Sequence, residues 1–162
     1  MTDPTNASEA VSDPGTRPVH GPVAVAGWVD DVVQRDLADP FSMDEARLYV
    51  IPRGEGQRVL LLDSDEHPYR LLERTADHDP ISAAALVVTG WCAPTDTPDE
   101  SRWRPSEHPM RQRVRVTVAI DARGIATVMR RSESPDEPEV MDDRGEGELP
   151  DALERWWRGD LV

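Results

Sequence analysis

Two carboxylates and a histidine with the potential for catalysis lie in the segment LLLDSDEHP, residues 60–68. Asp63, Asp65 and His67 are spaced two residues apart and directly follow an apolar run. Paired carboxylates can act as a nucleophile and as a general acid or base, and a histidine can transfer a proton near neutral pH. The run RVLLLD, residues 58–63, predicts a strand covered on both faces, which would present these groups at its end.

The sequence LLLDSD resembles the first motif of haloacid-dehalogenase-type phosphotransferases, which also follows a strand. The resemblance covers six or seven residues and implies a nucleophile at Asp63 and an acid or base at Asp65. It ends at Glu66, His67 and Pro68, which replace the small or β-branched continuation of the motif. A structural interpretation is simpler, because Asp, Ser and His side chains before a proline-led helix can accept hydrogen bonds from its first amides. We favour this interpretation over hydrolase or phosphotransferase chemistry.

A second chemically distinctive segment is RPSEHPMRQRVRV, residues 104–116, which is basic although the chain as a whole is acidic. Arginine side chains bind phosphates and carboxylates through paired N–H groups, and a nearby aromatic ring can stack on a planar group. The loop and strand over residues 91–115 therefore predict a surface that binds a protein or a small anionic ligand. The candidate binding residues are Trp103, Arg104, Glu107, His108, Arg111, Arg113 and Arg115.

The longer segment GWCAPTDTPDESRWRPSEHP, residues 90–109, is similar to the metal-site region of JAB/MPN-type isopeptidases. In that family a strand enters a loop of the form HxHP, and the sequence RPSxxD follows. Here Cys92, Ala93 and Pro94 supply none of the histidines, and Pro109 stands where the aspartate would fall. Only RPS is shared, so the comparison argues against zinc-dependent hydrolysis.

No pattern in the sequence predicts a metal ion or another cofactor. The residues that could be assembled into a metal site have neither the i, i+4 histidine spacing nor the density that such a site needs. They are Asp63, Asp65, His67, His78 and His108.

The cysteine and lysine contents exclude several other chemistries. Cys92 is the single cysteine, so the chain forms no intramolecular disulfide and no cysteine-clustered zinc site. All 18 Lys and Arg residues are arginines, which removes Schiff-base chemistry and the phosphate-loop lysine.

The formal net charge of −14 is concentrated outside the body of the chain. Residues 133–148 hold eight acids against Arg144 alone. Such a charge repels nucleic acid, so we expect a protein or a small anionic ligand as partner. We hypothesise that residues 133–148 form a flexible segment that folds over the arginines of the neighbouring strand.

The sequence also predicts a cytoplasmic protein that makes no contact with a membrane. The first twenty residues lack a charged leader followed by an apolar core, and no run approaches the roughly 18 apolar residues of a membrane span. The single cysteine fits a reducing compartment.

The hydrophobic periodicity predicts an α+β domain with a mainly antiparallel, five-stranded sheet and two or three helices. The expected order is α-β-β-α-β-β-β-α, which also occurs in roadblock-type and profilin-like modules. We expect helices over residues 25–37, 68–76 and 149–158, and strands over residues 47–51, 58–63, 84–91, 113–120 and from Ile125 onward.

The chain divides into four predicted parts. Residues 1–22 form a disordered tail and residues 23–132 the α+β domain. Residues 133–148 form the acidic flexible segment, and residues 149–162 an amphipathic helix that docks on the domain. In that helix we expect Trp156 and Trp157 to cover the sheet rather than to anchor a partner.

The last hairpin carries a prediction of register. A type I turn with a bulge at Gly124 would pair Asp121 with Ile125 and place Arg115 opposite Arg131. Arg113 would then lie opposite Glu133, on a face away from the core.

Three functions are compatible with these patterns. The first is a non-catalytic module that binds a protein or a small anionic ligand through residues 91–115. The second is a small hydrolase that uses Asp63 and Asp65 with a nearby histidine. The third is an acidic DNA-mimic inhibitor, which would require regularly spaced acids on an ordered surface. We favour the first.

Overall fold

The computed structural model describes residues 21–54, 56–92, 107, 109–141 and 148–160. Its elements are α1 (Pro22–Asp36), β1 (Ala46–Pro52), β2 (Leu60–Asp65), α2 (Pro68–Arg74), β3 (Ile81–Cys92), β4 (Gln112–Asp121), β5 (Gly124–Arg131), β6 (Ser134–Met141) and α3 (Glu148–Arg158). The strands form one antiparallel sheet in the order β2-β1-β3-β4-β5-β6. This confirms the α+β fold.

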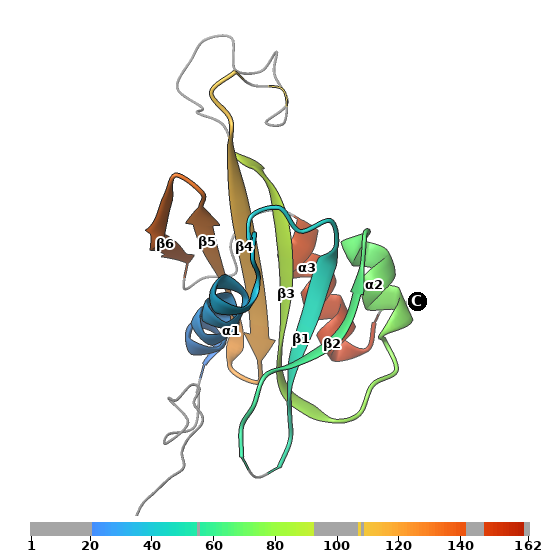
Figure 1. Ribbon diagram of the computed structural model, residues 1–162. Coiled ribbons are helices and arrows are strands. Elements are labelled where there is room, and N and C mark those ends of the chain that lie inside the picture. Colours follow the sequence, from blue (N-terminus) through green and yellow to red (C-terminus); the bar gives the residue numbers. More distant parts are fainter. Residues whose placement is uncertain (1–20, 55, 93–106, 108, 142–147, 161–162) are drawn as a thin grey trace, which may run out of the picture.

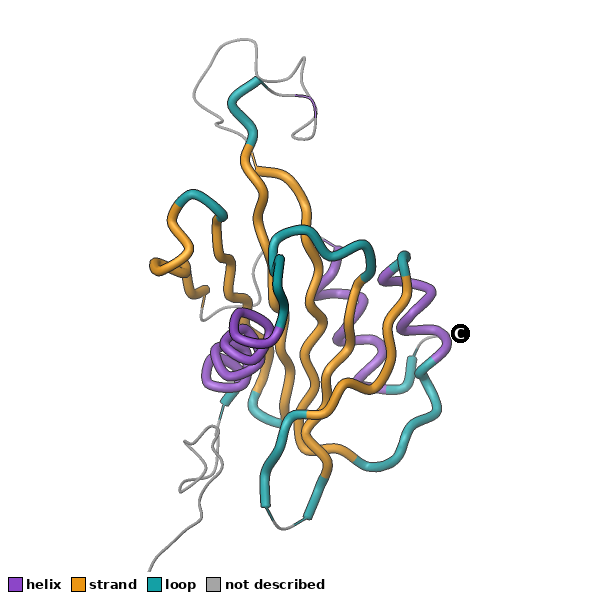
Figure 2. Tube along the Cα trace, in the orientation of Figure 1, coloured by secondary structure: helices purple, strands orange, loops and turns teal. Residues whose placement is uncertain are grey.

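Helices cover both faces of the sheet (Figures 1 and 2). Helix α1 packs across β3, β4 and β5 on one face, whereas α2 and α3 lie together on the other. Each face therefore has its own apolar core. Val25, Val29 and Val33 belong to the α1 core, and Leu72, Leu153 and Trp156 belong to the core under α2 and α3.

Helix α3 confirms the expected role of Trp156. Its ring is buried, and its Nε1 donates a hydrogen bond to the Thr75 carbonyl oxygen at 3.2 Å, so the polar end of the indole is satisfied. Trp157 is partly buried against the same core. No helix of the described residues combines the length and the apolar character that a membrane crossing needs.

The sheet contains one strand more than the sequence predicts. β6 lies in the segment 133–148, for which we expected no regular structure, and pairs with β5 from Arg131 opposite Ser134 to Thr127 opposite Met141. Pro135 is compatible with this strand because β6 is an edge strand, where a missing N–H need not break a ladder. The acidic composition favours a flexible segment over a strand, but an edge strand needs only one neighbouring strand to form, and here β5 is that neighbour.

The position of β2 also differs from the expectation. We expected the apolar run to be covered on both faces, but β2 is an edge strand because β3, and not β2, occupies the centre beside β1. Leu60, Leu61 and Leu62 are 39%, 48% and 39% exposed. An apolar run alone does not distinguish a central strand from an apolar edge.

The register of the last hairpin is one residue from the predicted one. Asp121 pairs with Gly124, and Arg115 therefore lies opposite Arg130 instead of Arg131. The turn has two residues, and the backbone N–H of Arg123 donates to Asp121 Oδ1 at 2.8 Å, which closes it without a bulge. Likewise the carbonyl of Arg113 accepts from the N–H of Ser132 rather than facing Glu133.

Candidate binding surface

The candidate surface lies where β3 and β4 extend past their neighbours as a two-stranded ribbon (Figure 1). The pairing of β1 with β3 ends at Val87, and that of β5 with β4 ends at Val114. The ladder between β3 and β4 continues and places Trp91 directly opposite Arg113. Paired residues in an antiparallel ladder share one face of the sheet. Trp91 and Arg113 thus lie on the face that α1 covers further along the strands.

Two guanidinium groups lie over the Trp91 ring. The Cζ atom of Arg113 is 4.5 Å from the ring centroid, and that of Arg111 is 4.8 Å from it. Trp91 and Arg113 are partly buried, and Arg111 is exposed. A cation over the face of an aromatic ring is attracted by the π-electrons of the ring, which favours this position for both guanidinium groups. The arrangement therefore gathers two positive charges at one aromatic ring, and guanidinium groups are a preferred partner of carboxylate and phosphate oxygens.

Arg115, the next arginine on the same face, has a different environment. Its side chain is 0% exposed and its Nη2 donates to Asp30 Oδ1 of α1 at 2.7 Å. Arg130 of β5 donates through Nε to Asp30 Oδ2 at 2.9 Å. Asp30 is itself 1% exposed. One buried carboxylate therefore binds both arginines of a directly opposed pair and offsets their repulsion.

The apolar periodicity of residues 25–37 predicts Asp30 on the polar side of the helix, with Asp31 and Gln34, but the structure buries Asp30. Asp30 is four residues after Ala26 and three before Val33, and both of these are buried. Residues with this spacing share one helix face. The spacing of Asp30 from Ala26 and Val33 therefore indicated a buried position, but a buried acid is expected there only if a basic strand lies beneath α1.

We hypothesised that residues 133–148 neutralise the arginines, and this holds only for the arginines nearest to β6. Arg131 forms an ion pair with Glu139, and Arg130 Nη1 donates to the carbonyl oxygen of Pro135. Arg115 instead uses Asp30, together with the carbonyl oxygen of Pro40 at 3.3 Å. The main acid that binds the buried arginines thus comes from α1.

The catalytic candidates Asp63 and Asp65 are bound by arginines of α2. Arg70 Nη2 lies 2.7 Å from Asp65 Oδ1, and Arg74 Nη2 lies 2.5 Å from Asp63 Oδ2. The Nη1 atom of Arg74 forms an ion pair with Asp65. Hydrogen bonds from Arg70 hold the pKa of Asp65 well below its usual value, and a hydrogen bond from Arg74 lowers the pKa of Asp63. Both carboxylates therefore stay ionised and are poor proton donors.

The side chains of the two described histidines, His67 and His78, contact groups other than these carboxylates. The side chain of His67 is mostly exposed, with Nε2 3.8 Å from Glu66 Oε1. His78 stacks on Trp156 at a centroid distance of 4.4 Å. Within the ranges that the structure describes, no three His, Cys, Asp or Glu residues are grouped so as to hold a metal ion. His67 does precede α2 as expected, but Asp65 Oδ1 accepts from the N–H of His67, at 2.9 Å, rather than from a helical amide.

Several predicted binding residues fall outside the described residues, namely Trp103, Arg104 and His108. Glu107 is described and is exposed. The structure therefore brings together Arg111 and Arg113, separates Arg115 from them by burial, and adds Trp91, which the sequence analysis did not select. The register of β3 against β4 reveals Trp91, and no local sequence pattern reports that register.

Comparisons of the chain with protein-family models, with curated proteins and with solved structures gave no match.

Proposed function

We propose that the protein is a non-catalytic cytoplasmic binding module that takes an anionic group, either an acidic segment of a partner protein or a small carboxylate or phosphate ligand. The observation that carries the proposal is the position of the Arg111 and Arg113 guanidinium groups over the Trp91 ring at the end of the β3–β4 ribbon. The ring restricts two long side chains before binding, which lowers the entropy lost when a ligand orders them.

The charge distribution supports an anion as ligand at this position. The chain as a whole has a net charge of −14, so it repels anions at long range. A basic site on such a protein selects ligands that gain short, paired hydrogen bonds over ligands attracted only at long range. The proposal therefore calls for a compact anionic group rather than a nucleic acid.

The hydrolase alternative receives less support from the geometry. Asp63 and Asp65 accept hydrogen bonds from Arg74 and Arg70, and these bonds connect β2 to α2. An acid or base matched to neutral pH needs a raised pKa, whereas both pKa values are lowered. The DNA-mimic alternative would have to use the acids of β6, where Arg131 already pairs with Glu139.

The proposal is tested by titrating the full chain at low salt with two probes, a deca-glutamate peptide and inorganic pyrophosphate. Arg111→Gln/Arg113→Gln should weaken binding of at least one probe by about tenfold or more, since it removes two charge-assisted contacts. NMR signals of the arginine Nε–H and tryptophan Nε1–H groups should shift on binding in the unaltered chain.

The matched control is Arg35→Gln/Arg123→Gln, which removes the same charge from exposed positions on α1 and in the β4–β5 turn. This control should retain affinity within about twofold, because distant exposed charges are screened. If both double variants lose affinity equally, or neither probe binds the unaltered chain, the proposal is rejected. A response to deca-glutamate alone would identify the ligand as an acidic protein segment.

A further inference from the structure

The two edges of the sheet differ in how they meet solvent. Within β6, Pro135 and Pro138 lack an N–H, and Asp136, Glu137 and Glu139 are exposed acids. Proline and charge on an edge strand prevent another strand from pairing with it. β2 instead exposes Leu60–Leu62, which contain neither proline nor charge, and its two acids, Asp63 and Asp65, are paired with arginines of α2. One edge is thus protected against strand addition, and the other is able to accept it.

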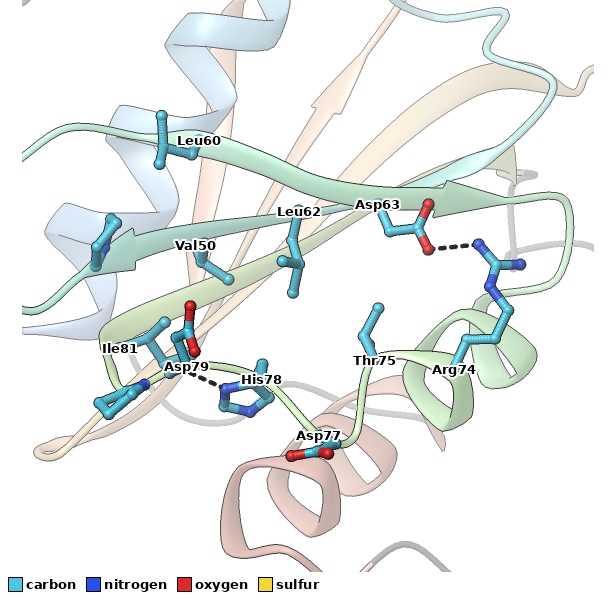
Figure 3. A pocket seen from close by; sticks show the side chains of 12 residues that line it. Val50, Leu60, Leu62, Asp63, Arg74, Thr75, Asp77, His78, Asp79 and Ile81 are labelled. Atoms are coloured by element: carbon cyan, nitrogen blue, oxygen red, sulfur yellow. Dashed lines mark hydrogen bonds and ion pairs between the residues drawn. The ribbon is translucent and has the colours of Figure 1, made fainter.

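An open pocket of about 620 Å³ adjoins the exposed leucines (Figure 3). Its apolar part is formed by Leu60 and Leu62 of β2, Val50 of β1 and Ile81 of β3. The volume is in the range of sites that hold small ligands or large side chains. A strand added beside β2 would run about 4.8 Å from it and direct every second side chain toward this face.

The polar part of the pocket holds three carboxylates, beside Arg74, Thr75 and His78. Asp77 and Asp79 lie in the connection between α2 and β3, and Asp63 lies within β2 (Figure 3). Arg74 also lines the pocket, but its guanidinium is bonded to Asp63 and Asp65. The pocket therefore combines an apolar floor with a negative rim, which complements a segment with apolar and basic side chains.

We propose that the β2 edge binds an extended segment of a partner protein by strand addition. An aliphatic or aromatic side chain of that segment enters the pocket, and arginine or lysine residues two positions away meet Asp77 and Asp79. This surface is separate from the Trp91 site and has the opposite charge preference. A second copy of this chain is a poorer occupant, because its net charge of −14 and its own acidic rim would oppose the approach.

The test uses an acetylated and amidated peptide, Thr-Arg-Thr-Leu-Thr-Arg-Thr, in which leucine and both arginines share one face of an extended strand. It should bind the full chain, and its isomer with glutamate for arginine should bind about tenfold more weakly or worse. Hydrogen exchange of amides in β2 should slow when the peptide binds.

Variants of the chain locate the peptide. Leu62→Ser should lower its affinity, and Asp77→Asn/Asp79→Asn should lower it about two- to tenfold, as for exposed charges at a rim. Val140→Ser is the matched control, because Val140 is exposed on the opposite edge strand. It should leave the affinity unchanged, and circular dichroism should show that each variant is folded.

Three results would overturn the proposal. The first is an arginine peptide that does not bind, or that binds no better than its glutamate isomer. The second is an equal loss of affinity in Val140→Ser and Leu62→Ser. The third is concentration-dependent self-association in sedimentation experiments that Leu62→Ser abolishes, which would assign the edge to a second copy of the chain.

Discussion

Arg113 and Arg115 stand two residues apart on the same face of β4, yet their surroundings differ in kind. Arg115 is fully buried beneath α1, where it shares Asp30 with Arg130. Arg113 lies beyond α1, with its guanidinium over the Trp91 ring. By the alternation of side chains along a strand, both arginines belong to the same face, so this alternation does not distinguish them. What separates them is the extent of the helix above, and this difference assigns one arginine to the fold and the other to the surface.

The largest expected effect concerns the buried cluster. Asp30→Ala leaves Arg115 and Arg130 without their shared carboxylate in a region with little access to water, which costs about 3–5 kcal/mol of unfolding free energy. Urea denaturation of the variant measures this cost. Asp31→Ala is the control, since Asp31 is 70% exposed and lies 3.5 Å from Arg130. Its expected cost is below about 1 kcal/mol, and equal costs for both variants would contradict the assignment.

A second variant separates the charge of the cluster from its volume. Asp30→Leu/Arg115→Met/Arg130→Met replaces three buried charged groups with apolar side chains and should recover most of the stability that Asp30→Ala loses. The comparison is again the free energy of unfolding in urea. A triple variant as unstable as Asp30→Ala would mean that the loss comes from packing and not from unpaired charge.

A smaller effect is expected at Asp65, whose arginine partners are about half exposed. Hydrogen bonds from Arg70, and charge from Arg74, lower the pKa of Asp65 in the folded state below the unfolded value of 3.8. The resulting stabilisation is present above the unfolded pKa and is lost as the pH falls through the folded pKa. Asp65→Asn should therefore lower the unfolding temperature at about pH 7, and the difference from the unaltered chain should shrink in acid. A difference that is constant with pH would argue against the ion pairs.

The smallest effect on the free energy of unfolding is expected at Glu139, which is exposed on β6. Glu139→Gln removes a carboxylate of β6 that pairs with Arg131, and both side chains contact water. The expected cost is below about 1 kcal/mol in urea denaturation. A cost equal to that of Asp30→Ala would restore the hypothesis that the acidic segment is the main counter-charge of the arginines.

The sequence predicted the parts of the fold that depend on local pattern. The alternation of Val114, Val116 and Val118 located β4, and the spacing of Leu153 and Trp156 located the buried face of α3. These signals are local because one strand or helix face carries them. The element order followed from them, apart from β6.

The remaining features depend on which elements become neighbours. Leu60–Leu62 indicate a strand, but the strand order decides that this strand is an edge. Trp91 becomes part of the candidate site because it pairs with Arg113 across 21 residues of intervening chain, part of which lies outside the described residues. Neither relation is contained in the composition or periodicity of a single segment.

The central claim is that Arg113 serves binding and Arg115 serves folding, and one matched pair of variants tests it most directly. Arg113→Gln and Arg115→Gln remove the same charge from the same face of the same strand. For each variant, the free energy of unfolding in urea and the affinity for deca-glutamate or pyrophosphate are measured. Arg115→Gln should lower the free energy of unfolding by about 3 kcal/mol or more. Arg113→Gln should lower it by less than about 1 kcal/mol but should weaken binding of the anion. An Arg113→Gln variant that binds the anion as tightly as the unaltered chain, or that is as unstable as Arg115→Gln, would contradict the account.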